Sequence, residues 1–225
     1  MSDHSLPAPA RRRVPAGLAA GILLCAAALG VAGGLLLRDL RGSTAATAVP
    51  ALPSFHGQAV WKAGARPAPG FSLRDQSGAL VSLASLHGRP VLLTFLDSQC
   101  KASCPIEGRQ LAWILRRLPA SQRPALVVVS VDRSGDTPAG IHRALAKWGL
   151  RGPWTTHWLN APTRAGLAAV WRAYSVTVEP ESNDIVHSLA LYLIDRRGDE
   201  RTAYLFPFLP SFVQRDLARL AGGHA

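Results

Sequence analysis

Two nearly continuous apolar runs in the middle of the chain predict buried β-strands. They occupy residues 91–96 and 125–131. Runs of this length are typical of strands that are covered on both faces, as in parallel sheets with helical crossovers. Nearer the C-terminus, residues 189–194 and 202–206 flank the polar turn 196–199. This second pattern predicts an antiparallel hairpin.

Apolar residues at helical spacing predict four helices between and after these strands. The sets that define their buried faces are Leu111, Ile114, Leu115 and Leu118; Ile141, Leu145 and Trp148; Leu167, Val170, Trp171 and Tyr174; and Val213, Leu217 and Leu220. In the last helix, Ser211 and Gln214 have the spacing of a capping box. A short strand at 154–159 and a hairpin within 71–83 complete the set. The order predicts an α/β fold, with parallel strands first and an antiparallel pair closing a mixed sheet.

The N-terminal part of the chain has a different pattern, a run of 24 residues without a charge at 14–37. As a helix this run would span about 36 Å, which exceeds a hydrocarbon core of about 30 Å. We therefore expect one transmembrane helix in contact with membrane lipid. Arg11, Arg12 and Arg13 precede the run. The positive-inside rule then places residues 1–13 in the cytoplasm.

Beyond this anchor we expect an extracytoplasmic tether at 38–66 and a folded domain at 67–225. The tether carries prolines, serines and threonines among alanines, without a sustained period. A cleaved signal peptide is the alternative, because Ala46-Thr47-Ala48 resembles a cleavage site. The apolar run, however, exceeds the usual length of about 7–15 residues for a signal core. We expect an uncleaved single-pass protein of the cell membrane.

Composition and charge narrow the class of protein. The chain has 225 residues, which leaves enough for one domain with a hydrophobic core after the anchor. Its net charge is +11, but the longest basic run is the arginine triplet before the anchor. Nucleic-acid binding is therefore not expected, because it requires a basic stripe with aromatic residues. Three cysteines are too few for a disulfide framework.

The candidate chemistry lies where the first buried strand ends and a helix begins. The segment there reads Cys100-Lys101-Ala102-Ser103-Cys104-Pro105. Pro105 suits the first turn of a helix, where its missing N–H needs no partner. The positive end of the helix favours thiolates, so at least one thiol should have a pKa below the free-cysteine value of about 8.5. A static disulfide or two buried thiols are the alternatives.

Sheet geometry selects a partner for the two thiols. A strand at 189–194 that runs antiparallel to 91–96 would begin at the edge where the cysteines lie. His187 directly precedes that strand and could project toward Cys100 and Cys104. Two thiolates and an imidazole form a ligand set that suits Cu(I), with zinc a weaker alternative that would lack a fourth protein ligand. A structural role for His187 remains open, and the other histidines are less favourably placed.

Residues from about 70 to 221 resemble the Sco/SenC family of thioredoxin-like proteins. The resemblance rests on the spacing of Cys100, Cys104 and Pro105, on the strand end at 129–132 with 136–137 after it, and on the pair His187-Ser188. The family usually has a proline and an aspartate between its cysteines, where this chain has Lys101-Ala102-Ser103. It also usually has an aspartate before the histidine, where this chain has Val186.

The resemblance implies a thioredoxin-like mixed sheet flanked by helices and a membrane-anchored copper chaperone. Copper, as Cu(I) or Cu(II), would be bound by Cys100, Cys104 and His187. The implied partner is the CuA site of cytochrome c oxidase, in subunit II, or another copper or thiol protein. A thiol-disulfide oxidoreductase, with Cys100 attacking and Cys104 resolving, is the second hypothesis. A redox-inert docking protein and a peroxiredoxin-like peroxidase are weaker alternatives.

Overall fold

A six-stranded mixed sheet organises this computed structural model, which describes residues 55–180 and 185–222. The strand order is β1-β10-β9-β4-β5-β6. The strands are β1 (Ala59–Val60), β4 (Val91–Leu96), β5 (Ala125–Ser130), β6 (Thr156–Leu159), β9 (Ala190–Ile194) and β10 (Glu200–Leu205). Two smaller sheets pair β2 (Ser72–Arg74) with β3 (Leu80–Ser82), and β7 (Val178–Pro180) with β8 (Ile185–His187).

The pairing of the central strands confirms the predicted mixed sheet. β4 pairs in parallel with β5, and β5 pairs in parallel with β6. On its other side β4 pairs antiparallel with β9, which forms the expected hairpin with β10. Every residue of β4, β5 and β9 is buried, as their continuous apolar runs require.

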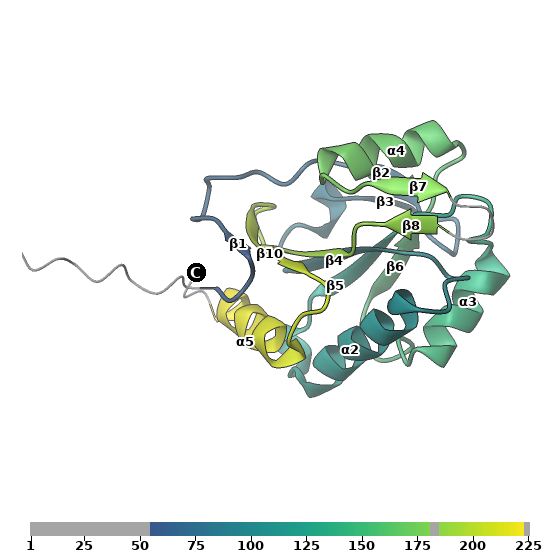
Figure 1. Ribbon diagram of the computed structural model, residues 1–225. Helices are drawn as coiled ribbons and strands as arrows, with labels where there is room; N and C mark the ends of the chain where they lie inside the picture. Colours follow the sequence, from purple (N-terminus) through teal and green to yellow (C-terminus); the bar gives the residue numbers. More distant parts are fainter. Residues whose placement is uncertain (1–54, 181–184, 223–225) are drawn as a thin grey trace, which may run out of the picture. The chain divides into compact units, whose positions relative to one another are not determined.

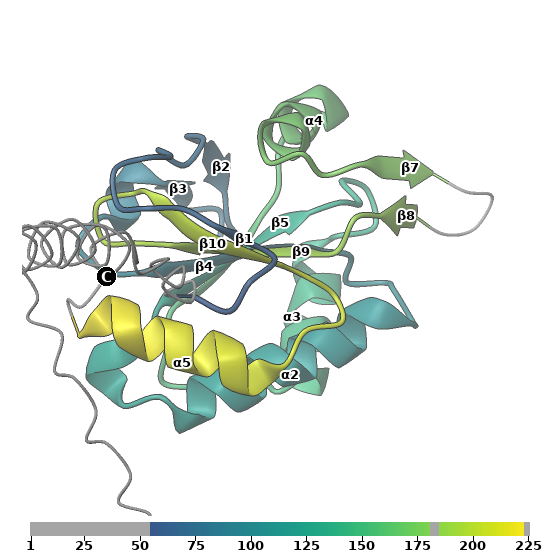
Figure 2. The same cartoon turned by 60° about the vertical axis from the view of Figure 1, so that its left-hand side comes forward.

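Helices cover one face of the sheet, and a helix with a hairpin covers the other (Figures 1 and 2). On one face lie α2 (Ser103–Arg117), α3 (Pro138–Lys147) and α5 (Pro210–Ala221). On the other lie α4 (Arg164–Ala173) and the pair β2–β3. Two short 3₁₀ turns, η1 (Ala84–Leu86) and η2 (Ala120–Gln122), complete the described elements. All four predicted helices are present.

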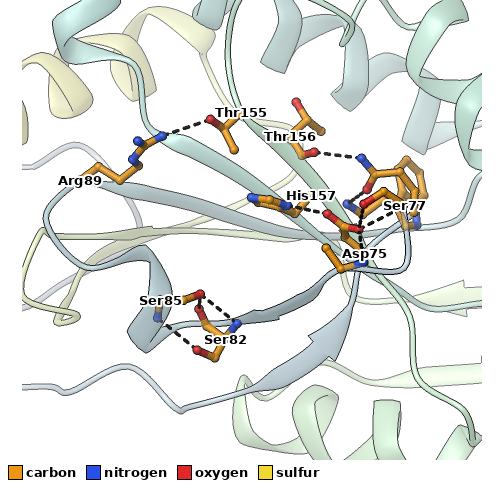
Figure 3. Close-up of polar contacts among 11 residues, drawn as sticks. Asp75, Ser77, Ser82, Ser85, Arg89, Thr155, Thr156 and His157 are labelled. Carbon is orange, nitrogen blue, oxygen red and sulfur yellow. Dashed lines mark hydrogen bonds and ion pairs between the residues drawn. The ribbon is translucent and has the colours of Figure 1, made fainter.

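Polar contacts attach the β2–β3 hairpin to the edge of the main sheet (Figure 3). His157 of β6 lies with Nδ1 2.9 Å from a carboxylate oxygen of Asp75 in the hairpin turn. The Gln76 side chain donates to the backbone oxygen of Thr156 at 3.1 Å, and its own oxygen accepts from the Trp158 N–H at 2.7 Å. His157 is therefore a structural histidine with a satisfied partner, as expected for a histidine inside a strand.

The structure corrects or extends three details. The predicted capping box in α5 is wrong, because the helix begins at Pro210 after Leu209 and has no side-chain cap. The last part of the predicted tether packs on the domain: Phe55 is buried, and β1 pairs with β10. The short strands β7 and β8 were not predicted, because three-residue strands show too little alternation to be detected.

The predicted anchor at 14–37 lies outside the described residues, as do 1–13 and most of the tether. Within residues 55–180 and 185–222, no helix combines the length and the apolar character that a membrane crossing requires.

Replacing Leu92 by alanine should lower the free energy of unfolding by about 2–5 kcal/mol, because the change leaves a cavity in a well-packed core. Leu92 is the second residue of β4 and is 0% exposed. Leu80 in β3 is 65% exposed, so Leu80→Ala is the matched control and should cost no more than about 0.5 kcal/mol. Urea denaturation measures both values. Equal losses would contradict the placement of β4 in the core.

Candidate functional site

The two cysteines lie in the loop and first helical turn that follow the central strand. β4 ends at Leu96, and α2 begins at Ser103. Cys100 lies in the loop and is half-buried, whereas Cys104 is buried in the first turn of the helix, and both are free thiols. The Cys100 N–H donates to the backbone oxygen of Asp97 at 3.3 Å, which closes the loop into a turn.

The surroundings of the two thiols separate their pKa values. A hydrogen bond from the Cys104 thiol is the largest influence on Cys100, and the backbone N–H groups of Cys104, Ala102 and Ser103 add to it. Together they outweigh burial and lower the pKa of Cys100 to about 6 from 9.0. The same hydrogen bond, followed by burial, raises the pKa of Cys104. The predicted low-pKa thiol is therefore Cys100, and Cys104 is its proton-bearing partner.

His187 lies at the end of β8 and reaches the buried cysteine. Its Nε2 is 3.7 Å from Cys104 Sγ. Its Nδ1 is 3.1 Å from the backbone oxygen of Ser188. A carbonyl oxygen only accepts, so Nδ1 is the donor to Ser188, and Nε2 is the ring nitrogen that faces the thiol. Ser188 is itself fixed, because its N–H donates to the backbone oxygen of Thr177 at 3.0 Å.

The side chains brought together here, two thiols and an imidazole, are of the types that bind soft metal ions. A histidine that ligates a metal usually donates its other ring N–H to a carbonyl or carboxylate, as His187 does to Ser188. Among the described residues, however, no three His, Cys, Asp or Glu side chains are gathered closely enough to hold a metal ion as they stand. Cys104 contacts His187 directly, and Cys100 is connected to the pair by its hydrogen bond with Cys104.

Three buried carboxyl groups lie around the thiols, and of these the sequence analysis singled out only Asp136, as part of the Sco/SenC resemblance, and missed Asp97 and Glu107. Burial raises the pKa of Glu107 to about 7, although its Oε1 lies 2.5 Å from the hydroxyl of Thr94. Burial also raises the pKa of Asp97 to about 7, with the charges of nearby carboxylates and of Cys100 adding to it. Asp136 accepts from the Ser98 N–H at 2.8 Å and from the Trp158 indole at 3.0 Å, and so holds the cysteine loop.

Glu107 left the clearest signal in the sequence, because it stands three residues after Cys104 and four before the buried Leu111. A carboxyl group on the apolar face of a predicted helix has no solvent to stabilise its charge. The remaining described histidines contact other groups or solvent. His56 lies 2.6 Å from a carboxylate oxygen of Asp216, and His142 is exposed on α3.

The fold and the site together define a class: a thioredoxin-like domain with a dithiol at a helix N-terminus and a histidine facing it. A sequence profile of the SCO1/SenC family matches residues 62–222, and the chain belongs to this family.

Individual relatives agree with this assignment. The SCO1 protein homolog of Bacillus subtilis (strain 168) is 25% identical over 145 residues, which cover 60% of this chain and 75% of that protein. The structure of Bradyrhizobium japonicum ScoI with copper bound has 26% identity and a TM-score of 0.57, covering 68% of this chain and 99% of that one. BsSco, described as a member of the Sco family of cytochrome c oxidase assembly proteins with a disulfide switch, has 20% identity and a TM-score of 0.59, covering 73% and 98%.

The pKa of Cys100 should govern its alkylation by iodoacetamide. In a Cys25→Ser background, the rate should rise around pH 6 and be level before pH 9.0 is reached, because the thiolate is the reactive species. Cys104→Ala removes the hydrogen-bond donor and should move this transition to higher pH. Lys101→Gln is the control and should move it less, since hydrogen bonds dominate the shift. A parent rate that rises only near pH 9.0 would contradict the arrangement.

Proposed function

We propose that this chain binds Cu(I) through Cys100, Cys104 and His187 and delivers it to another protein. The observation that carries the proposal is the contact of 3.7 Å between Cys104 Sγ and His187 Nε2, two residues 83 positions apart in the sequence. The copper-bound structure of the Bradyrhizobium japonicum relative supports it. Two sulfurs and an imidazole nitrogen are soft or intermediate ligands, which favour Cu(I) over hard cations.

The residues of the site would act in a definite order. Cys100 is already ionised near neutral pH and would be the first ligand. Cys104 holds its proton and would lose it when the metal binds, because only the thiolate is a ligand. His187 would supply Nε2, while the hydrogen bond from Nδ1 to Ser188 keeps the ring oriented. Copper binding should therefore release protons.

We further propose that the copper is destined for the CuA site of cytochrome c oxidase, in subunit II. Membership of the SCO1/SenC family and the description of BsSco as a member of a family of oxidase assembly proteins support this target. We also propose that residues 14–37 anchor the chain in the membrane, with 38–66 as the tether and the thioredoxin-like domain on the extracytoplasmic side. The charge-free run and the preceding arginines support this topology.

A thiol-disulfide oxidoreductase is the second candidate, and the separated pKa values of the two thiols favour it. The Cys100 thiolate would attack a substrate disulfide and expel one substrate sulfur as a thiolate. Cys104 would then lose its proton and attack Cys100 in the mixed disulfide, which releases the second substrate thiol and leaves a Cys100–Cys104 disulfide. This reaction needs the two sulfurs but not His187.

The two candidates are separated by copper competition against a Cu(I) chelator. In a Cys25→Ser background, His187→Ala, Cys100→Ser and Cys104→Ser should each weaken Cu(I) binding. For His187→Ala we expect at least about tenfold, the smallest effect typical of a change beside a metal. His142→Ala is the matched control, because this histidine is exposed on α3, and it should bind as the parent does.

The same variants should be assayed for reduction of a model disulfide. Under the copper proposal His187→Ala fails in the copper assay, while its reduction rate changes little. If His187→Ala binds Cu(I) as tightly as the parent, the three-ligand site is wrong and the oxidoreductase becomes the better assignment.

The proposed topology predicts that Cys100 can be labelled from outside. A membrane-impermeant maleimide applied to intact spheroplasts should label the reduced protein, and Cys100→Ser with Cys104→Ser should abolish that labelling. Cys25 lies within the proposed anchor and serves as an internal control that the reagent should not reach. Recovery of the mature protein in the soluble fraction, starting after Ala48, would contradict the anchor.

A further inference from the structure

A cleft of about 590 Å³ opens beside Cys100, between the cysteine loop and two helices. The loop from Ser98 to Ala102 forms one end of it. Pro105, Ile106 and Arg109 of α2 form one wall, and residues from Gly140 of α3 to Trp148, directly after that helix, form the other. Since Cys100 lies in the lining and Cys104 is buried, a molecule bound in this cleft would meet the Cys100 thiol first.

The cleft is strongly positive. Its lining includes the exposed side chains of Lys101, Arg109, Arg143 and Lys147. No aspartate or glutamate among the described residues lines it, and three carboxyl groups near the lining in sequence, Asp97, Glu107 and Asp136, are only 4%, 0% and 3% exposed. The ion pairs of the described residues all lie elsewhere in the domain. The four cations therefore have no acidic partner within the described part of the chain.

The lining of the cleft also includes apolar side chains. Trp148, the residue directly after α3, lies against α2 at Gly108, where an added Cβ would stand 2.6 Å from the indole ring. Ile106 is 46% exposed beside the cysteines, one of few large apolar side chains in the described residues that are so open. A ligand of this cleft should thus combine negative charge with apolar groups, since each would be matched by the lining.

We propose that this cleft docks an acidic, partly apolar segment of the partner protein. This segment would lie next to the partner's own thiols, with which Cys100 reacts. Arg143 and Lys147 are four residues apart on α3 and therefore rise about 6 Å along the helix. Alternate residues of an extended chain are about 6.7 Å apart, so two carboxylates in such a segment match this spacing. A single small anion would meet at most part of the set. The assignment rests on the proposed function, because it names the partner's chemistry at the same site.

The test uses a thiol reaction that needs no metal. Three short peptides each carry one cysteine as a mixed disulfide with thionitrobenzoate. They share the same apolar residues and differ only in the residues that flank the cysteine, which are glutamates, serines or lysines. The Cys100 thiolate attacks the peptide sulfur, a new S–S bond forms, and coloured thionitrobenzoate leaves as a thiolate. The full-length chain in uncharged detergent, with Cys25→Ser, supplies the reaction, and the rate of colour release is measured.

The acidic peptide should react about tenfold faster than the serine peptide at low ionic strength, and the lysine peptide should be slower. The preference should shrink toward an ionic strength of about 0.15 M, where the screening length falls to about 8 Å. Arg143→Glu with Lys147→Glu should abolish it. The matched control, Arg172→Glu with Arg197→Glu, makes the same change in net charge at exposed positions outside the cleft and should retain it.

Two results would overturn the proposal. One is an equal loss of preference in both double variants, which would make the effect one of net charge alone. The other result has two parts. No peptide is preferred, and anionic phospholipid vesicles protect Cys100 from alkylation in the parent but not in the Arg143→Glu, Lys147→Glu variant. The occupant of the cleft would then be a membrane surface. Using the ratio of two peptides in each variant cancels any change in the intrinsic reactivity of Cys100.

Failure of this proposal is distinguishable from failure of the proposed function. Arg143→Glu with Lys147→Glu should leave Cu(I) affinity within about twofold of the parent, because neither residue is a proposed ligand. If His187→Ala retains full Cu(I) affinity while the peptide preference stands, the copper site is wrong and the docking cleft remains. If the preference is absent and the three ligand variants lose copper, the reverse holds.

Discussion

The site depends on the antiparallel pairing of β9 with β4. Their ladder runs from Val91 opposite Ile194 to Thr94 opposite Leu191, so the end of β4 and the start of β9 meet at one edge of the sheet. The cysteines follow the first strand, and His187 precedes the second. A slip of one residue would turn every side chain of β9 to the opposite face, against a core that buries both faces. The apolar packing of the sheet, to which the buried Cys104 itself belongs, thereby brings the cysteines and His187 to the same edge.

The low pKa of Cys100 and the raised pKa of Cys104 have a common cause, the hydrogen bond between them. One thiol gains a stabilised charge because the other keeps its proton. The buried carboxyl groups likewise tend to keep their protons while a neighbouring group carries the charge. Asp97 and Glu107 each titrate near pH 7, so they are partly protonated when Cys100 is ionised. The interior around the thiols then avoids several uncompensated negative charges in a region that water reaches poorly.

Much of this architecture could be predicted because its signals are local. The runs that became β4 and β5, and the helical spacing of Leu111 to Leu118, need no tertiary knowledge. The position of His187 needed one step more, the assumption of an antiparallel closing hairpin. β7 and β8 could not be predicted, since each is held by its partner rather than by its own pattern. The capping box failed because the Ser and Gln spacing was present but the N-cap residue is Leu209, two positions before Ser211, so that Ser211 lies inside the helix.

The cleft beside Cys100 was invisible in the sequence, because its cations come from separate segments that only the packing of α3 against α2 brings together. Its position restricts how a partner reaches the site. Cys104 is buried whereas Cys100 lines the cleft, so an incoming thiol or disulfide in the cleft would reach Cys100 first. In either proposed function the exchange would begin at the most ionised sulfur and proceed inward. The difference in burial between the two thiols thus sets the order in which they react. The acidic segment that we propose would hold the partner beside Cys100, which reacts first.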